Sequence, residues 1–184
     1  SHKVAVEIAY LIHDGKVICA SDTELVVSFP TAKRTELGFL IQGPFKTTKA
    51  RDNIEGGSET EDNVGNASKT KPNRQLITTA AQLAADSLED LRDLGLLDVS
   101  SFKALPLKSK VFEDRSTKFF LPVYQAIREV LKSKCLLPRH GEGFVAANQA
   151  RLARGAQLAE VFSPEQLGVL FGGDQISWLN TAIT

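Results

Sequence analysis

Residues 4–20 read VAVEIAYLIHDGKVICA, and this stretch sets the fold class. From Val4 to Ile12 every second residue is a large apolar one, which is the period of two that a β-strand requires. The run ends at residues 13–16, where an Asp-Gly pair between apolar segments favours a type I′ turn. We therefore expect a hairpin whose second strand covers residues 17–20.

Two more β-rich runs follow the hairpin. We expect LVVSF at 25–29 to end at Pro30, and FLIQ at 39–42 to end at Gly43-Pro44. The first 45 residues or so therefore predict an antiparallel sheet. Residues 47–54 come next, with a threonine placed to cap a short helix.

A polar segment then separates the sheet from a long helix. Residues 55–71 are almost free of apolar side chains, so burial cannot offset the entropy of ordering, and we expect a mobile loop that is a tolerated insertion rather than a lid. The helix is expected to open at Pro72-Asn73, with Asn73 as its cap and Gly95 as its stop. Its inward positions are expected to be Leu76, Ala80, Leu83, Leu88, Leu91 and Leu94.

The remaining residues predict mainly helices. Residues 96–107 should return to the sheet as an extended segment, and Pro122 should open a helix to about Lys134. A small hairpin is expected at 136–145, followed by helices at 155–162 and from the capping box at 163–166. The inward residues of the first helix are expected to be Val123, Ile127, Val130 and Leu131.

These elements predict an α+β fold: an antiparallel sheet backed by helices, followed by a smaller, mainly helical portion with a small hairpin. We expect the sheet-plus-helix domain to cover residues 3–110 and the second portion to cover 111–184. Ser1-His2 resembles the remnant of a cleaved tag, and the chain contains no Met, so we expect a fragment of a larger parent.

Composition excludes several classes of function. Lys plus Arg and Asp plus Glu both total 22, so the chain has no basic excess and nucleic acid is not an expected partner. The longest apolar runs are a few residues, so we expect no membrane span. Two cysteines are too few for a disulfide framework and favour a reducing, cytoplasmic location.

Motifs for self-contained chemistry are missing from the sequence. The three histidines lie far apart and the cysteines form no ligand-like pair, so no metal site is expected. We expect Cys19 to be a buried structural thiol in a strand. The chain has neither a Gly-x-Ser-x-Gly elbow nor a glycine-rich phosphate loop, and a complete small enzyme therefore has no supporting pattern.

One stretch is more specific. Residues 39–54 read FLIQGPFKTTKARDNI and follow PTAKRTELG at 30–38. This pattern resembles a segment of the sacsin-like, heat-shock-chaperone-like ATPases, in which a Pro-Thr-x-x-x-Thr-x-Leu approach precedes a strand and Gly-Pro-Phe-x-Thr-Thr-x-Ala-Arg-Asp-Asn-Ile. The resemblance resumes at LLP (136–138), GFV (143–145), ARLARG (150–155) and WL (178–179), and so touches most of the chain.

The resemblance implies a place in the GHKL-type superfamily shared by gyrase, the ninety-kilodalton heat-shock chaperone, histidine kinases and MutL. Those proteins bind ATP and Mg²⁺ in an N-terminal domain with an Asp-x-Gly-x-Gly loop, whereas here Asp93-Leu94-Gly95 is not followed by the second glycine. This chain therefore resembles the following middle, or transducer, domain. Its implied partners are that N-terminal domain and a client protein, and no ATP binding or hydrolysis is expected from it alone.

The resemblance also implies which residues act on the nucleotide. By its position after the strand and turn, Arg51 resembles the arginine that the chaperone's middle domain lends to the γ-phosphate, where a positioned arginine stabilises developing charge. Lys46 and Lys49 are the other candidate phosphate contacts on the same segment. The competing interpretation is that Arg51 pairs with Asp52 or Glu55 on a solvated surface.

A function of a different class also fits the sequence. The chain would then be a non-enzymatic protein-interaction module with the same build, and its apolar C-terminal residues would form the binding face. Those residues are Phe162, Leu167, Leu170, Phe171 and Trp178.

Overall fold

The structure is a computed structural model that describes residues 5–55, 67–154, 156–173, 176–180 and 182. Its strands are β1 (Glu7–Ala9), β2 (Leu11–His13), β3 (Lys16–Ile18), β4 (Glu24–Val27), β5 (Phe29–Arg34), β6 (Leu40–Gln42), β7 (Leu137–Pro138), β8 (Phe144–Val145), β9 (Ala150–Arg151) and β10 (Ser177–Trp178). Its α-helices are α1 (Ala67–Asp93), α2 (Leu121–Ser133), α3 (Ala156–Val161) and α4 (Pro164–Phe171). The predicted α+β class is confirmed.

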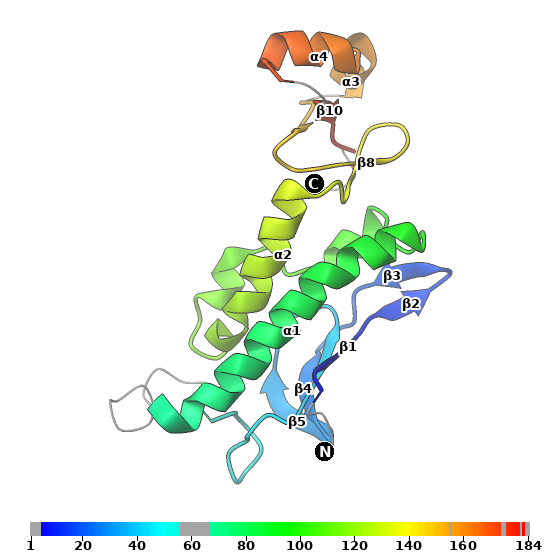
Figure 1. Ribbon diagram of the computed structural model, residues 1–184. Coiled ribbons are helices and arrows are strands. Elements are labelled where there is room, and N and C mark those ends of the chain that lie inside the picture. Colours follow the sequence, from blue (N-terminus) through cyan, green and yellow to red (C-terminus); the bar gives the residue numbers. More distant parts are fainter. Residues whose placement is uncertain (1–4, 56–66, 155, 174–175, 181, 183–184) are drawn as a thin grey trace.

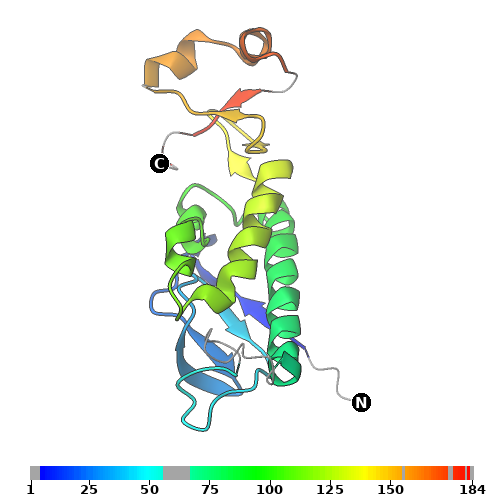
Figure 2. The same ribbon diagram turned by 90° about the vertical axis from the view of Figure 1, so that its left-hand side faces the viewer.

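The main sheet has the order β1-β6-β4-β5, and α1 runs across it with α2 alongside (Figure 1). Most strand pairs are antiparallel, but β4 and β6 meet in a parallel pairing at Val26 and Gln42. Beyond the end of α2, the short strands β7–β10 and helices α3 and α4 form a separate layer (Figure 2). No helix among the described residues is long and apolar enough to cross a membrane.

The opening run of alternating apolar residues forms two short strands in two different sheets, and not one continuous strand. Residues on either side of Tyr10 form β1, which pairs with β6, and β2, which pairs with β3 in the predicted hairpin. Both turn residues, Asp14 (φ 48°) and Gly15 (φ 70°), have the positive φ of a type I′ turn. The break lets Tyr10 turn inward, where its ring lies 5.1 Å from that of Phe39 and its hydroxyl lies 2.9 Å from that of Ser87.

The expected end of the third strand at Pro30 is wrong. Ser28 (φ 58°) turns the chain, and Pro30 lies inside β5, paired with Val26. Because β5 is at the edge of the sheet, a residue without an N–H group can sit there without leaving a neighbouring strand unpaired.

The expected helix at residues 47–54 is also wrong. This segment is a loop closed by an antiparallel bridge between Thr47 and Ile54. The threonine does accept a backbone hydrogen bond, from Asn53 to Thr48 Oγ1 (3.3 Å), but it stabilises a turn and no helix follows.

Helix α1 starts earlier than expected. It begins at Ala67, so Pro72 lies within it and Asn73 is an interior residue rather than a cap. Residues 67–71 of the expected loop are therefore helical, and residues 56–66 of that loop lie outside the described residues. The predicted stop at Gly95 (φ 71°) is confirmed: its N–H donates to the carbonyl of Arg92 (2.9 Å), and that of Leu96 donates to Leu91 (2.9 Å).

The buried face of α1 is rich in alanine. Leu83 and Leu94 are 39% and 71% exposed, so their expected inward positions are wrong. The buried face differs from the expected one because α1 packs against both the sheet and α2. Small side chains on this face let the three elements approach closely. The buried members of this face are Asn73, Ile77, Ala80, Ala81, Ala84, Ala85, Leu88 and Leu91.

Residues 96–107 do not return as a strand. They contain a 3₁₀ helix (Ser100–Ala104) beside β3, and two further 3₁₀ turns (Ser109–Phe112 and Lys118–Phe120) lead into α2. Gly38 donates its N–H to the carbonyl of Ala104 (3.1 Å) at this contact.

The elements after residue 120 mostly follow the prediction. Val123, Ile127 and Leu131 of α2 are buried, β7 and β8 form the expected hairpin, and Ser163 and Gln166 form the expected capping box. The core runs from Val17 to Leu136 across the expected division at residue 110, so α2 shares the core of the sheet. The division into two domains at this position stays a prediction.

We expect Gly38→Ala to destabilise the protein by about 1–3 kcal/mol, because a Cβ at this position would lie 2.5 Å from the Cα of Ala104. Urea denaturation measures the change. Gly173→Ala is the matched control, since its Cβ would meet only the flexible Ile176 side chain at 3.4 Å. Equal stability losses in the two variants would contradict the close-contact explanation.

Candidate functional site

The candidate site is the loop of residues 43–55, which we call the cationic loop, and it follows β6 at one end of the sheet. Its base is closed by the Thr47–Ile54 bridge and by a hydrogen bond from the Glu55 N–H to the Lys46 carbonyl (2.9 Å). Phe45 and Ile54 are buried and anchor the two sides of the loop in the core. The loop is therefore a well-anchored part of the domain.

Asn73 of α1 holds the base of this loop. Its side chain is fully buried, its Oδ1 accepts the N–H of Lys46 (2.8 Å), and its Nδ2 donates to the carbonyls of Lys46 (2.8 Å) and Glu55 (2.9 Å). One amide thus bonds to backbone groups on both sides of the loop, in addition to the hydrogen bond that the Lys46 carbonyl accepts from Glu55. The position of the loop is consequently tied to that of α1.

The tip of the loop is a tight turn. Thr48 donates its N–H to the carbonyl of Asn53 (3.0 Å) and its hydroxyl to the carboxylate of Asp52 (2.6 Å). Arg51 donates its N–H to the carbonyl of Thr48 (3.0 Å) and has a positive φ of 58°. A residue other than glycine with this conformation needs such surrounding bonds to hold it.

The Arg51 side chain is engaged with the neighbouring strands. Its Nη2 donates to the carbonyl oxygens of Val27 (2.9 Å) and Phe29 (3.2 Å), and its own carbonyl accepts the N–H of Ala32 (3.1 Å). These bonds attach the loop tip to the β4–β5 turn. Among the described residues, the guanidinium pairs with these carbonyl oxygens and not with Asp52 or Glu55, which was the competing expectation.

The two lysines of the loop are differently placed. Lys46 and Lys49 are exposed, and within the described residues their ammonium groups form no hydrogen bond or ion pair. The structure therefore brings all three predicted residues onto one loop, with Lys46 at its base and Lys49 and Arg51 at its tip. Two cations are available to a ligand as they stand, and the third is held by carbonyl oxygens.

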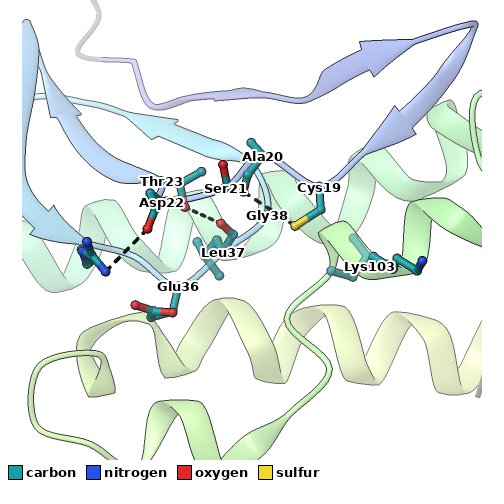
Figure 3. A pocket seen from close by; sticks show the side chains of 11 residues that line it. Cys19, Ala20, Ser21, Asp22, Thr23, Glu36, Leu37, Gly38 and Lys103 are labelled. Carbon is teal, nitrogen blue, oxygen red and sulfur yellow. Dashed lines mark hydrogen bonds and ion pairs between the residues drawn. The ribbon is translucent and has the colours of Figure 1, made fainter.

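A second region, a pocket of about 230 Å³, lies between the β3–β4 connection and Lys103 (Figure 3). Cys19 lines it and is exposed, so the expectation of a buried thiol is wrong. The Cys19 thiol lies 3.6 Å from the carbonyl of Ala20, and the Lys103 amine points away from it (Figure 3).

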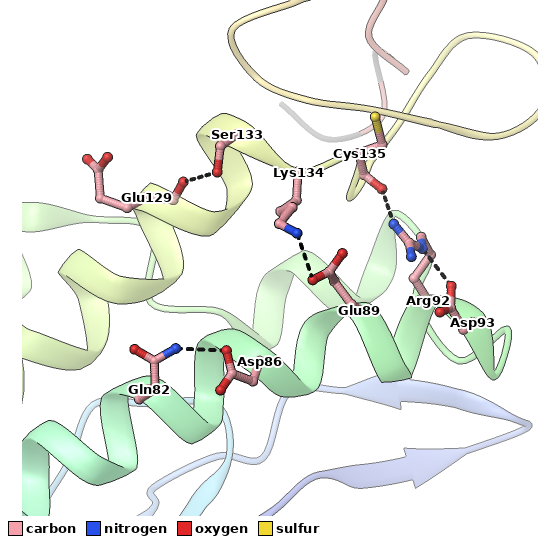
Figure 4. A network of polar contacts seen from close by, with 9 residues as sticks. All are labelled: Gln82, Asp86, Glu89, Arg92, Asp93, Glu129, Ser133, Lys134 and Cys135. Carbon is pink, nitrogen blue, oxygen red and sulfur yellow. Dashed lines mark hydrogen bonds and ion pairs between the residues drawn. The ribbon is translucent and has the colours of Figure 1, made fainter.

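Polar contacts join the far ends of α1 and α2 (Figure 4). Lys134 and Glu89 form an ion pair (3.3 Å), and Arg92 Nη1 donates to the carbonyl of Cys135 (3.0 Å), just before β7. Arg92 also donates to Asp93 (2.8 Å), and this hydrogen bond lowers the pKa of the Asp93 carboxyl. The end of α1 that is remote from the cationic loop is thus attached to the segment that leads into the C-terminal layer.

Among the described residues, no group of three or more His, Cys, Asp or Glu side chains is placed to hold a metal ion. Comparisons with protein-family models, with curated proteins and with solved structures found no match to this chain.

Asn73 is the site residue that sequence reasoning misplaced, since it was expected to cap a helix. A signal was present: Asn73 lies four residues before Ile77 and seven before Ala80, on the same face of the helix. A polar residue in register with a buried stripe has to pair with other polar groups, and here these belong to the loop backbone.

We expect Asn73→Ala to destabilise the protein by about 2–4 kcal/mol, because it removes three hydrogen bonds and takes from the Lys46 N–H and the Glu55 carbonyl the partner that they have in the fold. Amide hydrogen exchange at Lys46 should accelerate before exchange in α2 does. Gln75→Ala, at an exposed position of the same helix, is the control and should change stability by less than about 0.5 kcal/mol. Unchanged protection of the Lys46 amide in Asn73→Ala would contradict the conclusion that the Asn73 side chain holds the base of the loop.

Proposed function

We propose that this chain is the middle, transducer-type domain of a sacsin-like, heat-shock-chaperone-related ATPase that acts in the cytoplasm. The observation that carries the proposal is the cationic loop clamped to α1 by Asn73. Its sequence is the stretch that resembles this family, and its three cations are the groups that such a domain would bring to a nucleotide. ATP and Mg²⁺ would be bound by an N-terminal domain of the same parent.

The chemical task of the loop would be to stabilise charge on the γ-phosphate during hydrolysis. A guanidinium offers a planar fork that matches phosphate oxygens, and an ammonium supplies a point charge. Lys49 could approach the phosphate directly, whereas Arg51 would first have to exchange the carbonyls of Val27 and Phe29 for phosphate oxygens. That exchange would make engagement of Arg51 depend on docking of the nucleotide-binding domain.

The same contacts would pass the nucleotide state onward. A shift of the loop would act on α1 through Asn73, and α1 is joined at its other end to the segment before β7 through Arg92 and Cys135. Helix α1 would then connect the nucleotide end of the domain to the C-terminal layer. A client protein would be affected through that layer or through domains beyond it.

Sequencing the parent gene upstream of the codon for Lys3 tests the assignment most directly. An Asp-x-Gly-x-Gly loop together with a Glu-x-x-x-Asn helix encoded upstream of Lys3 would support it. An upstream sequence that lacks both patterns would contradict it.

In the intact parent, we expect Arg51→Ala to lower the ATPase kcat by about 10-fold or more while ADP affinity stays nearly unchanged, because the arginine acts on charge that develops in the transition state. Arg51→Lys should restore part of the rate, since it keeps the charge but loses the fork. Steady-state ATPase assays and ADP titration measure these effects.

Lys49→Ala is the matched control for loss of positive charge on the loop. A kcat of Arg51→Ala within about twofold of the unsubstituted parent would remove Arg51 from the mechanism. Loss of turnover in Lys49→Ala alone would transfer the role to that lysine.

For the isolated chain, we expect no saturable ATP binding at physiological nucleotide concentrations, because the motifs that hold the nucleotide would belong to the other domain. Isothermal titration calorimetry provides the measurement. A dissociation constant in the micromolar range would show a complete nucleotide site here and would overturn the transducer assignment.

An alternative function is a protein-interaction module, and the C-terminal layer favours it. Val161 (64%), Val169 (86%) and Leu170 (59%) are strongly exposed on α3 and α4. Leu167 is fully buried and so leaves the expected binding face, and Phe171 is partly covered by Arg151, whose Cζ lies 5.0 Å from its ring centroid. An upstream region without nucleotide-binding motifs would favour this module over the ATPase.

A further inference from the structure

Lys33 is a charged residue on the inward face of the sheet's edge strand. In β5 the buried positions are Thr31 and Lys33, while Ala32 and Arg34 are exposed. Lys33 retains only 5% of its accessible surface. Lysine is among the residues that are almost never this deeply buried without a partner, so its position needs an explanation.

The Lys33 ammonium has no direct partner among the described residues. Its backbone N–H donates to the Thr31 hydroxyl (3.2 Å), but its side chain forms no hydrogen bond or ion pair there. Burial lowers the pKa of the ammonium, and the charge of Asp114 offsets part of this effect. The Asp114 carboxylate is itself held by the N–H and hydroxyl of Ser116, so it acts on Lys33 from a distance.

Lys33 lines a pocket of about 420 Å³ at the edge of the sheet, within the usual size range of small-molecule sites. The pocket lies between β5, the cationic loop and the segment that follows the 3₁₀ turn Ser109–Phe112. Besides Lys33, its lining residues are Ala32, Arg34, Glu36, Asp52, Asn53, Arg115 and Ser116.

The charges of the lining limit what this pocket can bind. Lys33, Arg34 and Arg115 line the pocket with two carboxylates, Glu36 and Asp52, so the lining carries one net positive charge, and Asp114 acts on Lys33 from outside the lining. Arg34 also pairs with Asp22 outside the pocket (3.6 Å). A small anion fits this balance, whereas the carboxylates would repel a triphosphate.

Protection of the sheet edge is a simpler explanation for an inward lysine, because a buried charge discourages pairing with another chain. That role needs neither a pocket nor further cations. Here Ala32 is already bonded to the Arg51 carbonyl, so the loop covers part of this edge, and Lys33 lines a pocket together with two arginines and Asn53. These features together favour a ligand.

We propose that the pocket around Lys33 binds a single phosphate group, either inorganic phosphate or a phosphate monoester, with the Lys33 ammonium as its innermost contact. An ammonium is a good phosphate ligand, and the positive charges of Arg34 and Arg115 in the lining add to the attraction for an anion. The volume leaves room for a substituent on the phosphate. The proposal does not depend on the ATPase assignment, because every residue in it belongs to this chain.

The test titrates the isolated chain with inorganic phosphate at constant ionic strength and follows its amide NMR signals. We expect saturable shifts at Lys33, Asn53 and Ser116. Lys33→Met, which fills the same space without the charge, should weaken binding by about 10-fold or more. Lys132→Met, at an exposed position of α2, is the matched control and should bind phosphate like the unsubstituted chain.

Glycerol 1-phosphate and acetate complete the titration. Tighter binding of glycerol 1-phosphate than of inorganic phosphate would identify a monoester site, and the reverse order would identify a site for free phosphate; both support the proposal. Equal shifts with acetate at equal affinity, no saturable shift, or undiminished binding in Lys33→Met would overturn it.

A second measurement uses the unsubstituted chain and remains valid if Lys33→Met fails to fold. Reductive methylation with mass spectrometry reports the reactivity of each lysine. Phosphate should protect Lys33 selectively while leaving Lys132 unaffected. Equal methylation of Lys33 with and without phosphate would also overturn the proposal.

Discussion

The buried amide of Asn73 is the contact on which the arrangement of the candidate site depends. It lies inside α1 yet satisfies three backbone groups of the cationic loop, so the loop and the helix form one mechanical unit. Removing it would take this partner from the Lys46 N–H and the Glu55 carbonyl, and a partly buried polar group that loses its partner destabilises a fold more than an ordinary hydrogen bond stabilises it. The loop cannot move relative to α1 without breaking these hydrogen bonds, so it keeps a defined position at the end of the sheet.

The alanine-rich face of α1 complements this clamp. Small side chains at positions 80, 81, 84 and 85 let the helix lie close to its neighbours, so it is held along most of its length. At its far end, Arg92 binds the carbonyl of Cys135 (Figure 4). One helix thus contacts the loop in its first turns through Asn73 and the segment before the C-terminal layer at its end through Arg92.

The cationic loop and the Lys33 pocket share a wall. Asp52 and Asn53 line the pocket, and Lys49 and Arg51 belong to the same turn of the chain. The carbonyl bonds of Arg51 to the β4–β5 turn hold this wall against β5. A ligand that changed the bonds of Arg51 would consequently alter the pocket, so the two proposed sites are physically connected even though each is tested separately.

Local patterns determined much of the fold from the sequence alone. Asp14-Gly15, Gly95 and the capping box at Ser163 depend on backbone conformation within a few residues, and all three are as predicted. The loop at 47–54 and the partners of Asn73 could not be predicted, because they are decided by contacts between residues 18 to 27 positions apart in the chain, and the register of Asn73 with the buried face indicated only that it needs a polar partner. The sequence placed Lys46, Lys49 and Arg51 on one segment, but only tertiary contacts decided that carbonyl oxygens hold Arg51 and that Lys33 is buried beside a pocket. Propensity acts over one or two turns of chain, whereas the pairing of buried polar groups is settled when distant segments pack together.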